Sequence, residues 1–273
     1  MKRINVLLIV CLFTKLSFSI SQVDTISVFS TKMKKQVKAV VVTPDNYNKK
    51  ATYPVVYLLH GYSGNYSDWI KNVPVIKSLS SKYQLLIVCP DGAYNSWYFD
   101  SPVDSSSQYE SYITKDLVSY IDTHFSTIPT KSARAITGLS MGGHGALYIA
   151  MRNSNIFASA GSMSGGVDLT TITNKYEITN KIGKYEQHPE EWRKRSVMNL
   201  VDSLKNKELD LIIDCGVADF FYQINSNLHQ KLLGLKIDHD YIERPGAHTW
   251  EYWTNAIEYQ LLYFEKCFSK LKK

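Results

Sequence analysis

The chain has 273 residues, of which 44% are hydrophobic and 21% charged, which is typical of a folded protein with a sizeable core. The formal net charge is +6, but Lys2, Arg3 and Lys15 fall in the predicted N-terminal leader described below, so the chain expected after its removal is only weakly basic. No basic run is interleaved with aromatic residues, which argues against nucleic acid as a partner.

The N-terminus predicts a signal peptide over residues 1–21. A positive start is followed by a short apolar run at 6–13 and by small residues, with cleavage expected after Ser19 or Ser21. A lipid-modified Cys11 is disfavoured because Val10 before it is not small. No later stretch reaches the roughly 18 to 20 apolar residues of a membrane span. We therefore expect an exported protein, periplasmic or extracellular, with no stable membrane span.

Apolar runs alternate with helix-patterned segments along the rest of the chain. Several runs, such as VVYLLH and LLIVCP, are continuous, as in strands buried on both faces of a parallel sheet. Strands are predicted at 25–29, 36–42, 55–60, 85–90, 133–138, 158–162, 209–215 and 239–243. Helices are predicted at 67–83, 109–124, 142–152, 222–235 and 250–271.

This alternation predicts a single α/β domain over 22–273, with a mostly parallel central sheet of about eight strands and helices on both faces. The first two strands follow each other without a helix and should form an antiparallel edge. The polar segment 165–207 contains no strand-like run. It is predicted to be a helical insertion near the carboxyl edge of the sheet.

After removal of the leader, the chain retains Cys89, Cys215 and Cys267. The first two end apolar runs and are expected to be buried free thiols. The histidines and cysteines lack the spacing of metal ligands. The sequence therefore predicts no metal site and no cofactor.

The strongest local signal is ITGLSMGGHGAL, in which Gly138-Leu139-Ser140-Met141-Gly142 forms a G-x-S-x-G motif between a strand and a helix. That context is typical of a nucleophile elbow, a turn so tight that glycine is needed two residues before and after the serine. Ser140 is therefore the predicted nucleophile. The N–H of Met141, at the start of the helix, is a predicted oxyanion donor.

The predicted general base is His248, in ERPGAHTWEYW between the last strand and the last helix. Such a loop can reach back to a serine at the carboxyl edge of the sheet. His144 is the rival, but its helix leads away from the elbow, so we expect a buried packing role. His60 is expected to support the neighbouring loop.

The acid that orients the histidine should lie between serine and histidine in the chain. In LIIDCGVADFF, Asp214 is still within a strand, whereas Asp219 lies in the loop beyond it and is favoured. Asp219 could instead cap the helix that starts near Phe221. We expect that one residue could not easily serve both roles.

The second oxyanion donor should come from the loop after an early strand. LLHGYSGNYSDW has this position, and its glycines, Gly61 and Gly64, let the backbone approach the serine. The N–H of Tyr62 is the candidate. An ordinary glycine-rich turn is the alternative.

In chain order, the motifs YLLHGYSGNYSDW, CPDGAYNSWYFDS, GLSMGGHGAL, DCGVADFF and PGAHTWEYW resemble the esterase D, feruloyl esterase and tributyrin esterase family of α/β-hydrolases. The resemblance extends from about Val55 to Trp253. It implies the α/β-hydrolase fold and serine esterase activity. It also maps Ser140, Asp219 and His248 onto the family triad, and Tyr62 and Met141 onto its oxyanion donors.

The resemblance also implies that the segment around Trp97 borders the acyl pocket. Together with Tyr98 and Trp250, Trp97 is a candidate for the pocket lining, although aromatic residues at these positions also suit core packing. The expected substrate is a short-chain or carbohydrate-linked ester of the acetyl or feruloyl type. Two alternatives remain: an acyltransferase that uses an acceptor other than water, and a non-catalytic carbohydrate-binding protein on the same fold.

Overall fold

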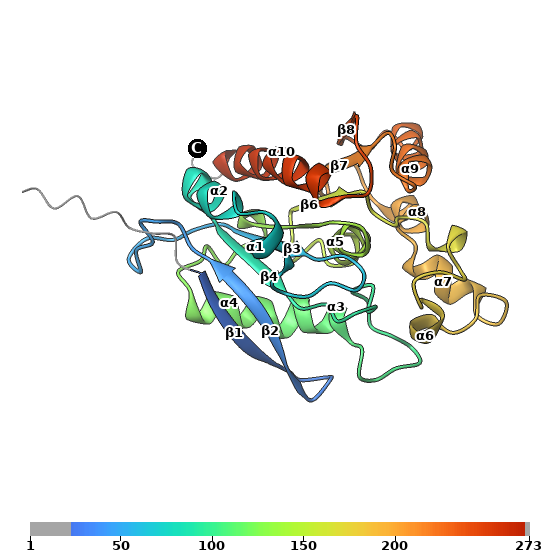
Figure 1. Ribbon diagram of the computed structural model, residues 1–273, viewed down its shortest axis with the longest axis horizontal. Coiled ribbons are helices and arrows are strands. Elements are labelled where there is room, and N and C mark those ends of the chain that lie inside the picture. The colour runs from blue at the N-terminus through green and yellow to red at the C-terminus, as the bar shows by residue number, and fades with distance from the viewer. Residues whose placement is uncertain (1–22, 271–273) are drawn as a thin grey trace, which may run out of the picture.

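The structure is a computed structural model that describes residues 23–270, so the predicted signal peptide lies outside the described residues. Its centre is an eight-stranded sheet in the order β1-β2-β4-β3-β5-β6-β7-β8 (Figure 1). From β4 to β8 all neighbours are parallel. The β1–β2 pair is antiparallel, as predicted for the edge, and the β2–β4 pair is antiparallel as well. The strands are β1 (Val23–Ser30), β2 (Lys35–Val42), β3 (Val55–Leu59), β4 (Leu86–Pro90), β5 (Arg134–Gly138), β6 (Ser159–Met163), β7 (Asp210–Gly216) and β8 (Asp240–Arg244).

The continuous apolar runs arise because both faces of the sheet are covered. In β3, Val55, Tyr57 and Leu59 join one core, whereas Val56 and Leu58 join the other. All five side chains are fully buried. Alternate residues of one strand therefore stabilise two separate helix layers, which explains why no polar residue interrupts the run.

Helices cover the two faces in separate sets. The face with Tyr57 packs against α4, α5 and α9, and the opposite face against α1, α2 and α10. In Figure 1, α10 and α2 lie above the sheet and α4 lies below it. The helices are α1 (Asp68–Asn72), α2 (Ile76–Tyr83), α3 (Tyr109–Ser111), α4 (Val118–His124), α5 (Met141–Arg152), α6 (Thr179–Ile182), α7 (Pro189–Arg195), α8 (Val197–Leu200), α9 (Tyr222–Gly234) and α10 (Trp250–Ser269).

The prediction of one helix over 67–83 is wrong. Helix α1 ends at Asn72 and α2 begins at Ile76, with Pro74 between them. Proline has no N–H to donate and clashes with the preceding helical turn, so the chain leaves the helix there. The segment 109–124 is helical as predicted, although its middle, Tyr112–Leu117, is a π-helical stretch between α3 and α4.

The segment between β6 and β7 contains the three short helices α6, α7 and α8, which lie at the end of the molecule away from the β1–β2 edge (Figure 1). Trp192 of α7 is fully buried and donates its indole N–H to the Gly183 carbonyl at 3.0 Å. The segment is therefore anchored by its own apolar residues despite its polar composition.

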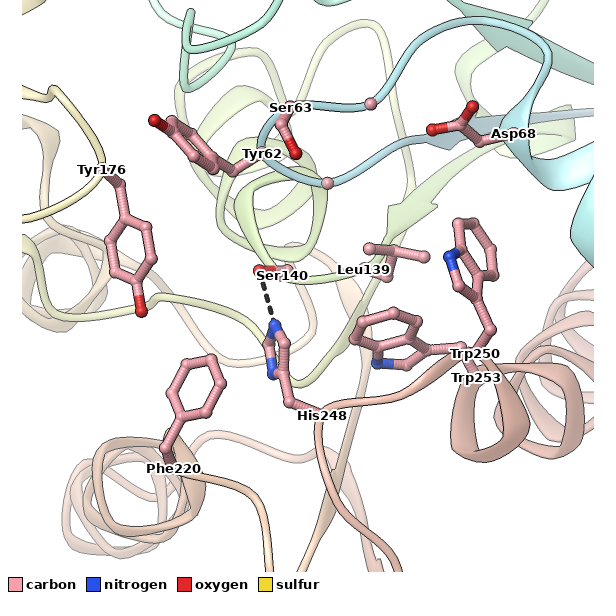
Figure 2. A pocket seen from close by; sticks show the side chains of 12 residues that line it. Tyr62, Ser63, Asp68, Leu139, Ser140, Tyr176, Phe220, His248, Trp250 and Trp253 are labelled. Carbon is pink, nitrogen blue, oxygen red and sulfur yellow. Dashed lines mark hydrogen bonds between the residues drawn. The ribbon is translucent and has the colours of Figure 1, made fainter.

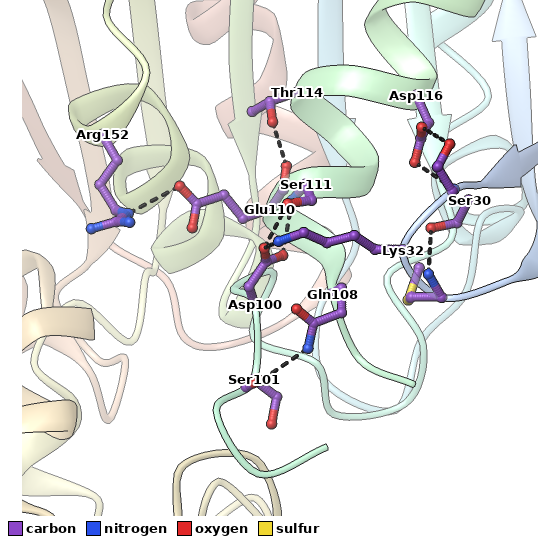
Figure 3. Close-up of polar contacts among 12 residues, drawn as sticks. Ser30, Lys32, Asp100, Ser101, Gln108, Glu110, Ser111, Thr114, Asp116 and Arg152 are labelled. Carbon is purple, nitrogen blue, oxygen red and sulfur yellow. Dashed lines mark hydrogen bonds and ion pairs between the residues drawn. The ribbon is translucent and has the colours of Figure 1, made fainter. Parts of the chain in front are cut away.

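Polar contacts fix the loop that follows β4 (Figure 3). Asp100 accepts hydrogen bonds from Lys32 of the β1–β2 hairpin at 2.8 Å and from the Ser111 N–H at 2.9 Å. Glu110 of α3 accepts from the Arg152 guanidinium of α5 at 3.0 Å. Asp100 thus attaches the 91–108 loop to the hairpin and to α3, and α3 is in turn attached to α5.

The order of the strands reverses at β3, which lies between β4 and β5. The chain leaves β3 toward the α1 face and leaves β5 toward the α5 face. Leu59 pairs with Gly138, so both strands end together. In an open α/β sheet such a reversal leaves a crevice at the carboxyl ends of the strands, where ligands bind.

Cys89, Cys215 and Cys267 are free and buried, as predicted for the first two. Burial raises the pKa of each thiol, to about 11 for Cys267. Across residues 23–270, no helix combines the length and apolar character needed to cross a membrane.

Candidate active site

Ser140 lies in a strained turn between β5 and α5. Its backbone has φ 55° and ψ −116°, and a positive φ is rare for a residue with a side chain. A Cβ atom on Gly138 would lie 2.7 Å from the Gly142 carbonyl carbon, and one on Gly142 would lie 2.5 Å from the His60 carbonyl oxygen. Both positions therefore require glycine, as expected of a nucleophile elbow.

The side chains of Ser140, His248 and Asp219 form one hydrogen-bonded chain. His248 Nε2 lies 2.9 Å from Ser140 Oγ (Figure 2), and His248 Nδ1 lies 2.8 Å from Asp219 Oδ2. An ionised carboxylate only accepts hydrogen bonds, so the ring proton belongs on Nδ1. Nε2 then carries the lone pair and can accept the serine proton.

Asp219 is positioned by the chain on either side of it. Its Oδ1 accepts the Phe221 N–H at 2.7 Å, just before α9 begins, and its side chain is fully buried. The preceding Ala218 N–H donates to the Gly246 carbonyl of the loop that carries His248, at 2.9 Å. Helix α9 begins at Tyr222 with Phe221 as its N-cap and has no side-chain cap, so Asp219 contacts His248 without capping the helix.

The rival acid, Asp214, is occupied elsewhere. It is fully buried in β7 and accepts hydrogen bonds from Tyr252 and Arg244. Burial raises the pKa of this carboxyl, and the bonds from Tyr252 and Arg244 oppose that rise. Asp214 therefore joins β7 to β8 and α10, while Asp219 is the carboxylate at His248.

The other two histidines near the elbow are structural. His144 is fully buried, and burial lowers its pKa to about 4, so it is neutral and donates from Nε2 to the Arg195 carbonyl at 2.8 Å. His60 Nε2 accepts the Gly92 N–H at 2.7 Å, while its Nδ1 donates to the Gly61 carbonyl at 2.8 Å. Burial also lowers the pKa of His60. His60 thus ties the loop after β3 to the loop after β4.

The loop after β3 lies directly against the elbow. A Cβ atom on Gly61 would lie 2.6 Å from the Leu139 Cδ1 atom and 3.5 Å from Ser140 Cβ, so the loop approaches the elbow closely at this glycine. Among residues 23–270, neither the Tyr62 N–H nor the Met141 N–H has a hydrogen-bond acceptor. The two predicted oxyanion donors are therefore both uncommitted, and they lie on the two elements that meet at Ser140.

A pocket of about 290 Å³ opens at Ser140 and His248. Its walls are mainly aromatic, with two polar side chains (Figure 2). The aromatic residues are Tyr62, Tyr176, Phe220, Trp250 and Trp253, and the polar ones are Ser63 and Asp68.

Of the three residues predicted to line the pocket, Trp250 does so in the structure, whereas Trp97 and Tyr98 are buried and lie outside the lining. Trp97 donates its indole N–H to the Tyr176 carbonyl at 3.5 Å. Tyr176 lines the pocket, and Trp97 lies behind it. Tyr98 donates its hydroxyl to the His60 carbonyl at 3.1 Å. Both are therefore core residues that support the pocket walls.

Sequence reasoning missed several lining residues, among them the aromatic residues Phe220, Tyr176 and Trp253. Phe220 is 62% exposed beside Asp219, and its ring centroid lies 4.2 Å from that of His248. Its exposure could have been suspected from its place in a loop directly after the favoured acid. Tyr176 comes from the polar segment 165–207, where no local pattern distinguishes it.

A mostly parallel sheet, a G-x-S-x-G elbow and a serine bonded to histidine define the class as the serine hydrolases of the α/β-hydrolase fold. Residues 30–264 match the family described as "Putative esterase", and the chain therefore belongs to this esterase family. The resemblance seen in the sequence motifs is thus confirmed.

Named relatives agree with this assignment. The chain is 27% identical to an acetyl esterase of Caldicellulosiruptor saccharolyticus, over 85% of this chain and 94% of the relative. It is 25% identical to the S-formylglutathione hydrolase of Bos taurus, over 70% of this chain and 73% of that enzyme.

Solved structures show the same fold. A ferulic acid esterase superimposes with a TM-score of 0.78 at 25% identity, covering 91% of this chain and 99% of that one. The serine hydrolase FphF of Staphylococcus aureus does so with a TM-score of 0.80 at 20% identity, covering 90% and 99%.

Proposed function

We propose that this chain is an exported serine carboxylic-ester hydrolase in which Ser140 is the nucleophile, His248 the general base and Asp219 the orienting acid. The observation that carries the proposal is the position of His248, whose two ring nitrogens lie 2.9 Å from Ser140 Oγ and 2.8 Å from Asp219 Oδ2. A histidine held by a buried carboxylate and aimed at a serine on an elbow is arranged for nucleophilic catalysis.

The proposed reaction proceeds through an acyl-enzyme. His248 takes the Ser140 proton as Oγ attacks the ester carbonyl, and the N–H groups of Tyr62 and Met141 stabilise the oxyanion. The alcohol leaves with a proton donated by His248. Water, deprotonated by the same imidazole, then attacks the acyl-enzyme, releases the acid and restores Ser140.

We propose short-chain or carbohydrate-linked esters as substrates. The names of the acetyl esterase and ferulic acid esterase relatives support this class. The pocket lining includes the polar side chains of Asp68 and Ser63, which provide hydrogen-bond partners, and the indole of Trp250, which provides an aromatic face that a sugar could use. Export is proposed from the leader-like sequence of residues 1–21.

The test is labelling by a fluorophosphonate probe and turnover of p-nitrophenyl acetate, with the full chain produced from its own start codon. Ser140→Ala should abolish labelling and lower kcat by at least about 10⁴-fold without lowering the melting temperature. Ser162→Ala is the matched control, since Ser162 is a buried serine of β6 whose hydroxyl has no partner among the described residues. Turnover that survives Ser140→Ala would rule out this nucleophile, and recovery only inside the cell would contradict export.

A further inference from the structure

Tyr176 and the residue after it form a strained corner at the pocket. Tyr176 has φ 55° and Glu177 has φ 53°, so two successive residues with side chains adopt the left-handed conformation. Such a conformation costs free energy and persists only where the surroundings hold it. The corner lies in the segment between β6 and β7, to which no local sequence motif assigns a function.

Two hydrogen bonds from the loop after β4 hold this corner. Asn95 Nδ2 donates to Glu177 Oε2 at 2.7 Å, and Trp97 Nε1 donates to the Tyr176 carbonyl at 3.5 Å. Trp97 is itself buried and fixed. The position of the Tyr176 ring therefore depends on contacts about 80 residues away in the chain.

The Tyr176 ring joins an aromatic group contributed by three other segments. Its centroid lies 5.5 Å from that of Tyr62, 6.1 Å from that of Trp97 and 6.0 Å from that of Phe221. In Figure 2 its side chain points toward Phe220, on the side of Ser140 away from Trp250. Tyr176 thus forms one wall of the pocket.

The two sides of the pocket differ in polarity. Tyr176 and Phe220 form one side, which carries no charged group, whereas the other side combines the carboxylate of Asp68 with the indoles of Trp250 and Trp253 (Figure 2). An apolar acyl chain is favoured on the Tyr176 side because it is removed from water there, and a hydroxyl-bearing alcohol is favoured where hydrogen-bond partners lie.

We propose that Tyr176 is a specificity-determining residue that limits the size of the acyl group, and that Asn95 and Glu177 are the residues that position it. The inference rests on the proposed ester hydrolysis at Ser140. A fixed ring at this wall leaves room for short acyl groups and obstructs longer ones.

The experiment compares kcat/KM for p-nitrophenyl acetate, butyrate and octanoate in wild type and in Tyr176→Ala. The ratio of octanoate to acetate should rise by about tenfold in Tyr176→Ala, because a pocket that gains a few methylenes of space gains binding of that order. Tyr176→Phe should match wild type, and Tyr176→Trp should lower the ratio. Tyr120→Ala is the control, since Tyr120 lies on α4, outside the residues that line the pocket.

The positioning role is tested with the Asn95–Glu177 pair. Glu177→Ala and Asn95→Ala should each shift the ratio in the direction of Tyr176→Ala, and the double variant should shift it no further than either single change. Glu177→Gln should restore the wild-type ratio, since its amide oxygen can accept from Asn95.

An unchanged ratio in both Tyr176→Ala and Tyr176→Trp would overturn the inference. So would an effect seen only when the alcohol is varied, with acetylated xylose compared against p-nitrophenyl acetate, because Tyr176 would then face the leaving group. These outcomes are distinct from failure of the proposed function, in which wild type itself is neither labelled by the fluorophosphonate probe nor active on any ester.

Discussion

Replacing Asp219 by asparagine tests the proposed chemistry most directly. The substitution keeps an oxygen that can accept the Phe221 N–H, which the aspartate accepts at 2.7 Å. Opposite His248 Nδ1, however, the amide can present an NH₂ group, which favours the imidazole tautomer with its proton on Nε2. That proton then lies toward Ser140 Oγ, 2.9 Å away, where the lone pair is needed.

The expected loss in kcat is about 10⁴-fold, the magnitude for a histidine held in the wrong tautomer, or about 5.5 kcal/mol of transition-state stabilisation. The melting temperature should stay close to that of wild type, because the backbone contact of Asp219 survives. Asp219→Ala should lose comparable activity and also destabilise the fold by about 1 kcal/mol, because the Phe221 N–H loses its acceptor.

The assay is kcat and KM for p-nitrophenyl acetate between pH 5 and 9, paired with thermal melts. Asp214→Asn is the matched control, because Asp214 is a buried carboxylate of the same strand–loop segment that bonds Arg244 and Tyr252. Asp214→Asn should lower the melting temperature, and its loss in kcat should be smaller than that of Asp219→Asn. If Asp219→Asn kept more than a tenth of wild-type kcat, or if Asp214→Asn cost more activity than Asp219→Asn, the assignment of the acid would be wrong.

Two further predictions concern stability, measured by urea unfolding. Gly142→Ala should destabilise the protein by about 3 kcal/mol or more, because the added Cβ would lie 2.5 Å from a backbone oxygen. Gly234→Ala is the control, because a Cβ there would have no atom within 4 Å. It should be neutral or slightly stabilising. Equal effects would refute the steric account. Burial lowers the pKa of His144 from 6.5 to about 4 in the folded protein. As pH falls from 6.5 to 4, the unfolded chain therefore binds a proton at this histidine before the folded protein does. The free energy of unfolding should fall by about 3 kcal/mol over that range. His144→Gln should remove that part of the pH dependence, and an identical slope in both proteins would contradict it.

Much of the fold could be predicted because its signals are local. Strands buried on both faces require uninterrupted apolar runs, and the observed strand ends fall within two residues of those expected. The break between α1 and α2 was local too, since Pro74 marks it, and it was missed only because the apolar spacing continues across it. Ser140 could be located for the same reason: its turn needs glycine at Gly138 and Gly142, whatever the rest of the chain does.

The lining of the pocket could not be predicted, because it depends on which side chains meet across the fold. Trp97 and Tyr176 are 79 residues apart, yet their contact decides that the tryptophan is buried and the tyrosine faces the substrate side. An aromatic residue has the same propensity in either place. The sequence by itself therefore determined the sheet, the elbow and the candidates for the hydrogen-bonded chain. Only the tertiary structure decided that Asp219 meets His248 and that Tyr176 forms the wall, because those contacts arise when loops from separate strands converge at one edge of the sheet.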